Sequence, residues 1–347
     1  MKNSTDKKSG LKISVILKIF YVGIVLGIIC YILNEQAEKI VQQLKCMTVI
    51  TLAELILCSV FFNVIEGISY YLMGKRCNNE FRLIHGIGCS YYCAFFKLST
   101  LGSGTAAAGM VYLNRYKVQP SKSFGMITVN YIIQKLAIVI VCLIGFATHF
   151  EDMKEYYHKY FKFIALGVLV TIMFAIVLLL IILWGRLHTF IIYLTDKFIK
   201  RDDWKNKAEG FKQQLLSVRG ESYELLKEKG FLIKILILNM VKFLGWYMLP
   251  CVVLGYNDTR SIFLGLSISA LASALIGVIP SPGAAGSTEA MFYVLFSVIT
   301  QSAKATTIML IYRCFTYIFP FMAGAVMIML KKLKLSRGLN SYFGKNN

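Results

Sequence analysis

Charged residues are scarce in this sequence, and their scarcity excludes an ordinary soluble domain. Only 16% of the 347 residues are charged, whereas a soluble domain carries about a quarter. The chain is 57% hydrophobic, and no charged residue occurs in Phe163–Trp184 or Ser261–Thr288. Uncharged apolar runs of about 18 residues or more indicate membrane spans. The sequence therefore predicts an all-α integral membrane protein.

Motifs of soluble enzymes are also missing. The chain contains no GxxxxGK[ST] and no HExxH sequence, and Gly102-Ser-Gly104 follows no predicted strand. The nine cysteines show no CxxC spacing, and Cys89 and Cys93 have no histidine beside them at metal spacing. We therefore expect no metal, no cofactor and no soluble catalytic domain.

The net charge of +20 has two possible explanations, nucleic acid and the membrane surface. The basic residues gather in the segments between apolar runs, as the positive-inside rule requires. This distribution favours the membrane and anionic phospholipid as partners, and we expect no nucleic acid.

Eight hydrophobic segments follow along the chain, and we interpret them as about six full spans plus two re-entrant helical hairpins in a helical bundle. The segments are Ile13–Leu33, Thr48–Met73, Leu83–Asn114, Ser123–Phe150, Phe161–Gly185, Gly230–Gly255, Ser261–Thr300 and Lys304–Leu330. The first resembles a signal sequence without a cleavage site, so we interpret it as an uncleaved span. Residues 186–229 form a polar insert, predicted as cytoplasmic amphipathic helices or, alternatively, as a solvated linker.

Two segments, 83–114 and 261–300, are too long for one span of about 20 residues. Each is interrupted near its middle, where glycine and proline break a helix. Such breaks are tolerated only where the freed backbone groups face protein or water. The residues that define the breaks are Gly102 and Gly104 in the first segment, and Pro280, Pro282, Gly283 and Gly286 in the second.

Loop charges predict the topology. Lys75, Arg76 and Arg82 precede the first hairpin and Arg115 follows it, so both of its ends are expected in the cytoplasm. Both ends of the second hairpin are then outside. The chain's two termini are predicted to be cytoplasmic, in a multi-pass protein of the plasma membrane.

The two breaks resemble each other in sequence. Leu101-Gly-Ser-Gly-Thr-Ala-Ala aligns with Ile279-Pro-Ser-Pro-Gly-Ala-Ala at a shift of 178. At a shift of 179, Gln134 matches Arg313 and Gly145 matches Gly324. We interpret the chain as one membrane domain, 1–347, with an inverted-topology repeat of residues 13–150 and 230–331, a plan that many transporters share. Chance similarity between Ala/Gly-rich segments is the alternative.

Ionisable residues inside spans are candidates for function because they are costly in lipid. They are Glu54, Glu66, Lys97, Lys135, Lys242, Glu289 and Arg313. Lys97 and Lys242 have an alternative, which is to reach the surface from a span end. Glu54 has another, which is simple contact with water at the outer surface.

Glu289 and Arg313 carry the sharpest hypothesis. Glu289 follows the second break and is expected to cap free N–H groups of the next helix. Arg313 needs a partner, either Glu289 or a bound phosphate; a purely structural Glu289–Arg313 pair is the competing interpretation. The predicted binding residues for a lipid headgroup are Arg313, Glu289, Lys135, Gln134, Lys242 and Ser287.

The segment Ile279-Pro-Ser-Pro-Gly-Ala-Ala-Gly-Ser-Thr-Glu289 resembles the P-x-P-G-G-x-G-x-x-E signature of the lysylphosphatidylglycerol synthase transmembrane family, also called flippase-like. Tyr312-Arg-Cys-Phe-Thr-Tyr-Ile-Phe-Pro320 resembles the family's Tyr-Arg…Pro span. Ala285 departs from a usual glycine, and Gln134-Lys135 stands where relatives often have an arginine nearby. The resemblance covers residues 10–335 and implies the membrane part of a multiple peptide resistance factor.

This resemblance implies two activities. The membrane part would move anionic phospholipids, aminoacylated ones included, between leaflets, and a separate synthase domain would transfer lysine from lysyl-tRNA to phosphatidylglycerol, which confers resistance to cationic peptides. The sequence ends 17 residues after Leu330, so we expect no synthase domain and no lysyltransferase activity. A transporter for a soluble anion is a third possibility. A homo-oligomer or a separate synthase partner is possible.

Overall fold

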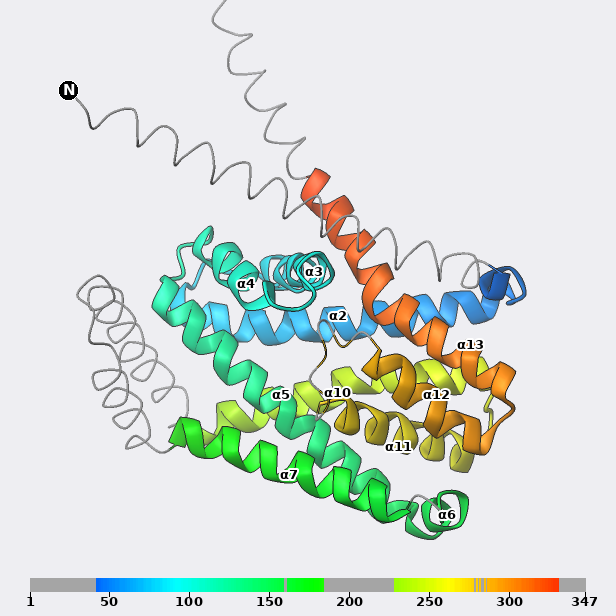
Figure 1. The fold of residues 1–347 in the computed structure, drawn as a ribbon. Helices are drawn as coiled ribbons and strands as arrows, with labels where there is room; N and C mark the ends of the chain where they lie inside the picture. Colours follow the sequence, from blue (N-terminus) through cyan, green and yellow to red (C-terminus); the bar gives the residue numbers. More distant parts are fainter. Residues whose placement is uncertain are drawn as a thin grey trace, which may run out of the picture.

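The computed structural model describes residues 42–158, 161–183, 228–277, 279, 281, 284 and 286–330. All regular elements in these ranges are helices, as predicted (Figure 1). They are α2 (Val49–Cys77), α3 (Leu83–Ser99), α4 (Thr105–Asn114), α5 (Pro120–Thr148), α6 (Phe150–Tyr156), α7 (Phe161–Leu183), α10 (Lys229–Leu254), α11 (Thr259–Ile276), α12 (Ser287–Ile299) and α13 (Ser302–Arg313). A π-helical segment, Cys314–Ile318, follows α13, and helix continues to Leu330.

The predicted segments agree closely with these helices. Both long segments are divided as expected, the first into α3 and α4 and the second into α11 and α12. Between the predicted spans 123–150 and 161–185 the structure has the short helix α6, which the sequence interpretation missed. The predicted first span and almost all of the insert 186–229 lie outside the described residues.

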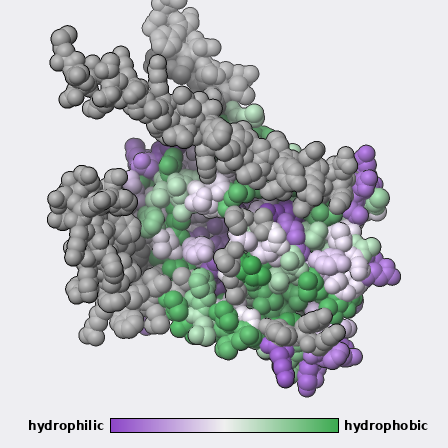
Figure 2. Space-filling model, viewed as in Figure 1, coloured by the Kyte–Doolittle hydropathy of each residue, from purple (hydrophilic) through white to green (hydrophobic). Residues whose placement is uncertain are grey.

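Five described helices are long and apolar enough to cross a membrane: α2, α5, α10, α11 and the helix Ser302–Leu330. Large apolar side chains such as Leu57 and Ile237 are exposed on these helices, as lipid-facing residues are. Figure 2 shows hydrophobic residues over much of this face, with hydrophilic residues at the end that holds α6, at the opposite end and near the middle. The molecule is therefore a polytopic helical membrane protein. Because α11 is long enough for a crossing, re-entrance of the second hairpin stays a prediction.

The same succession of helices occurs twice. A long helix (α2 or α10) is followed by two shorter helices separated by a break (α3 and α4, or α11 and α12), and then by another long helix. In Figure 1, α2 and α10 run in opposite directions, and so do α5 and the α13 helix. This arrangement is the one expected of an inverted repeat.

Each of the two closing helices packs against the broken segment of the other half. Gly145 on α5 meets α11, where a Cβ on Gly145 would lie 2.7 Å from Ser267 Oγ and 2.9 Å from Ser267 Cα. Gly324, on the helix that continues α13, meets α3, where a Cβ would contact the Tyr91 carbonyl oxygen and lie 3.0 Å from Phe95 Cβ. The two glycines that matched in sequence therefore serve the same purpose, which is close helix–helix approach.

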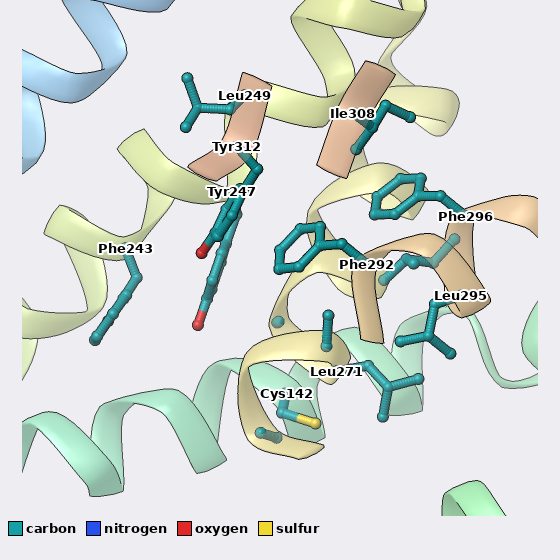
Figure 3. Packing of buried hydrophobic residues seen from close by; sticks show 14 of the residues in the cluster. Cys142, Phe243, Tyr247, Leu249, Leu271, Phe292, Leu295, Phe296, Ile308 and Tyr312 are labelled. Carbon is teal, nitrogen blue, oxygen red and sulfur yellow. The ribbon is translucent and has the colours of Figure 1, made fainter. Parts of the chain in front are cut away.

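The largest buried cluster lies under the second hairpin. Phe292 on α12 stacks on Tyr312 of α13 with ring centroids 3.8 Å apart. Figure 3 shows these rings beside Tyr247 from α10, with Leu271 of α11 and Cys142 of α5 below them. This packing fixes α12 against helices from both halves, and it holds the start of α12 in a defined position.

Candidate functional site

Glu289 and Arg313 form the pair that the sequence suggested. Arg313 Nε lies 3.4 Å from Glu289 Oε1, and both side chains are largely buried. The other carboxylate oxygen, Oε2, accepts the Gly286 N–H at 2.8 Å, so Glu289 caps the start of α12 as expected. Gly286 has φ of 80°, a left-handed conformation that glycine adopts without strain. One carboxylate thus links the second break to α13.

Lys242 lies at the contact between the two halves. Its ammonium group pairs with Glu66 of α2, and its side chain is 0% exposed, so the alternative in which it reaches the membrane surface is wrong. Asn130 Nδ2 of α5 donates to Glu66 Oε1 at 3.4 Å, and Asn239 Nδ2 of α10 donates to Asn130 Oδ1 at 3.2 Å. This polar network pairs the buried charges of Lys242 and Glu66, which would otherwise be costly to bury, while Asn239 Oδ1 has no hydrogen-bond partner among the described residues.

Lys135 lies at the second break and not beside Glu66. Its ammonium nitrogen is 3.8 Å from the position that a Cβ on Gly277, the residue that ends α11, would occupy. Its ammonium also lies 5.4 Å from the ring centroid of Tyr131. Among the described residues, Lys135 forms no ion pair with a carboxylate. A half-buried ammonium with no carboxylate partner in the described part of the chain is therefore next to the break.

Lys97 lies at the first break, in the last turn of α3. Its ammonium is 4.2 Å from the ring centroid of Tyr317 and 5.0 Å from that of Trp246. Within the described part of the chain, it too has no carboxylate partner. The Arg313 guanidinium lies over the same Tyr317 ring, at 3.9 Å.

The sequence interpretation missed Trp246 and Tyr317 as site residues. Aromatic residues are common throughout the chain, so nothing in their spacing marked them. Tyr317 depends on the π-helical segment Cys314–Ile318, which no sequence pattern predicted, and such segments are frequent at functional sites.

The other predicted residues differ in their positions. Ser287 Oγ lies 2.6 Å from Ser281 Oγ, across the second break. Gln134, next to Lys135, is half-buried and forms no hydrogen bond to another described residue. Glu54 is exposed, in agreement with the interpretation that it is simply wet. Pro280, Pro282 and Gly283 lie outside the described residues, whereas Gly102, Gly104 and Gly286 stand in the breaks as predicted.

The central region has an excess of positive charge. Among the described residues, four cationic side chains (Lys97, Lys135, Lys242 and Arg313) lie at the two breaks and at the contact between α2 and α10, with two carboxylates (Glu66 and Glu289), which leaves a difference of two. An anion in this region would offset this excess of positive charge.

The fold and these interior charges define a class: a polytopic helical membrane protein with two broken helical segments around a basic centre. A family model described as lysylphosphatidylglycerol synthase TM region matches residues 15–324. The chain belongs to this family, as its second-half motif had suggested. Neither curated proteins nor solved structures gave a match to the chain.

Proposed function

We propose that this protein binds the anionic headgroup of a phospholipid between its two broken segments and moves the lipid between the leaflets of the plasma membrane. The observation that carries the proposal is the excess of two positive charges among the described groups at the centre. Cations inside a membrane protein are costly and point to a pathway or a bound counter-ion. A phospholipid is the abundant anion that reaches the membrane interior from the side.

The predicted site residues have different roles in this proposal. Lys135 and Arg313 supply positive charge near the second break, and Gln134 and Ser287 supply neutral hydrogen-bonding groups. Glu289 positions Arg313 and caps α12, and Lys242 with Glu66 joins the halves. The N-terminus of α12 adds backbone N–H groups, which favour an anion. The competing structural interpretation assigns the Glu289–Arg313 pair to stability alone.

Transport can be tested in vesicles that contain the purified full chain and a trace of fluorescently labelled phosphatidylglycerol. A membrane-impermeant reductant bleaches only the outer leaflet, so transport shows as bleaching beyond half of the label. We expect Arg313→Gln and Lys135→Gln to slow this phase, and Lys304→Gln, an exposed lysine of α13, to leave it unchanged. If wild-type protein bleaches no more than protein-free vesicles, the proposal fails.

A second candidate function is participation in lysylphosphatidylglycerol synthesis, which the family's description favours. It predicts lysylphosphatidylglycerol in the lipid extract of a host that lacks this lipid and expresses this chain alone. We expect none from this chain. If the protein instead transports a soluble anion, inorganic phosphate should compete with that anion for uptake into the vesicles.

A further inference from the structure

We propose that Lys97 and Lys135, one at each break, bind the phosphate of the headgroup together, and that Tyr317 separates this phosphate site from Arg313. The inference rests on the proposed function and specifies which residues hold the charged part of the lipid. The sequence analysis named Lys97 as an ionisable residue inside a span but did not include it among the predicted binding residues.

The first step is the difference between the four cations. Lys242 pairs with Glu66, and Arg313 pairs with Glu289. Among the described residues, Lys97 and Lys135 contact aromatic rings but no carboxylate. Cation–π contacts do not neutralise charge, so these two ammonium groups supply the excess that an anion would offset.

The second step is where the two lysines stand. Lys97 is in the last turn of α3, immediately before the first break. Lys135 approaches Gly277, where α11 ends at the second break. Each ammonium group therefore stands at the edge of a different broken segment. An anion held by both would contact both broken segments simultaneously.

The third step concerns Tyr317. Its ring contacts the Lys97 ammonium at 4.2 Å and the Arg313 guanidinium at 3.9 Å. The π-helical turn places this ring against cations from two different elements, α3 and α13. Tyr317 thereby keeps Arg313 with Glu289, and it leaves Lys97 available for a ligand.

A phosphodiester fits this pair better than a carboxylate does. It carries one negative charge spread over two non-ester oxygens, and each oxygen can accept a hydrogen bond from a separate ammonium group. The two sources of such chemistry are a phospholipid headgroup and soluble phosphate, and the experiment below separates them.

Trp246 provides a direct signal because Lys97 lies over its ring. The chain has three tryptophans, so Trp184→Phe and Trp204→Phe leave Trp246 as the only emitter. The full chain in detergent would be titrated with short-chain phosphatidylglycerol and, separately, with inorganic phosphate. We expect the lipid to change Trp246 emission as Lys97 leaves the ring, and inorganic phosphate to bind much more weakly.

Lys97→Gln and Lys135→Gln should each weaken lipid binding by about tenfold or more, as loss of a charge-assisted hydrogen bond does. Lys97→Arg should retain most of the affinity, and Lys304→Gln should retain all of it. If phosphatidylglycerol binds wild type and both Gln variants equally, the Lys97–Lys135 site is wrong while the proposed function stands. If inorganic phosphate binds as tightly as the lipid, the proposed function is wrong.

A measurement on the wild-type sequence covers the case in which a variant fails to fold. Phosphatidylglycerol should slow amine-reactive labelling of Lys97 and Lys135, but not of Lys304, relative to protein in neutral detergent alone. Equal labelling of all three lysines with and without the lipid would overturn the proposed site.

Discussion

The two breaks are closed by different means. In the first, backbone hydrogen bonds close the end of α3. Gly102 N–H donates to Lys97 O at 2.7 Å and Leu101 N–H donates to Leu98 O at 3.3 Å, which is the Schellman pattern. In the second, side chains close the gap through Glu289 and the Ser281–Ser287 contact. The second break is therefore tied to the central charges, while the first is closed independently of them.

This difference predicts that changes to the central charges disturb the second broken segment more than the first.

Removing one member of the Glu66–Lys242 pair should have the largest effect. Lys242→Ala leaves the Glu66 carboxylate without its ammonium partner, and loss of one partner of a buried pair costs about 3–5 kcal/mol. Thermal unfolding in detergent, followed by size-exclusion chromatography, measures the loss. The double variant Glu66→Gln/Lys242→Ala should lose less than the sum of the losses of Glu66→Gln and Lys242→Ala alone, because the two side chains interact directly. Additive losses would show that the pair is not coupled.

The next effect concerns the glycines that allow each closing helix to approach the opposite half. Gly324→Ala should cost about 1–3 kcal/mol by overpacking, because the added methyl meets the rigid Tyr91 carbonyl. Gly145→Ala should cost a similar amount, because its added Cβ would lie 2.9 Å from Ser267 Cα, a backbone atom that rotation of the hydroxyl does not move. Gly230→Ala is the control, because nothing lies within 4 Å of its added Cβ. Equal stability of the Gly324 and Gly230 variants would contradict the packing described here.

Side-chain closure of the second break predicts a smaller and more selective effect. Glu289→Ala removes both the cap of Gly286 and the partner of Arg313, and loss of such a cap costs about 1 kcal/mol. Glu289→Gln keeps a side-chain oxygen that can accept the Gly286 N–H, so this variant should retain the cap. The matched change in the first break is Thr100→Ala, which removes the acceptor of the Gly104 N–H at 2.8 Å. Both Ala variants should lower the unfolding temperature, but only Glu289→Ala should also weaken lipid binding.

The smallest effect is expected at two non-glycine residues in left-handed conformations, one in each break. Leu101 has φ of 49° and Ala284 has φ of 55°. Replacing Ala284 with glycine should stabilise the protein by up to about 1 kcal/mol, since glycine adopts this conformation without steric cost. Leu101→Gly should gain less because it also loses a half-buried side chain. A fall in the unfolding temperature of Ala284→Gly would contradict the strain inferred here.

Helix positions could be predicted from the sequence because membrane spans need continuous apolar residues. The predicted start at Leu83 and end at Asn114 coincide with the start of α3 and the end of α4. The capping role of Glu289 was also predictable, because an acidic residue in the first turn of a helix is a local signal. These features depend on residues that are near one another in the sequence.

The rest of the site depends on contacts between distant segments. Glu66 and Lys242 are 176 residues apart, and no local pattern pairs them. The position of Tyr317 depends on one π-helical turn, and the position of Lys97 over Trp246 depends on how α3 and α10 each pack against α2. Apolar periodicity carries no information on either.

The central claim is that the basic centre between the two broken segments holds an anionic phospholipid. Mass spectrometry of the lipids that co-purify with the full chain tests it most directly, when compared with the lipids of the membrane from which it was extracted. The account predicts that anionic phospholipid is enriched on the wild-type protein and that this enrichment falls in the Lys97→Gln/Lys135→Gln variant. A co-purified lipid composition equal to that of the surrounding membrane in both proteins would contradict it.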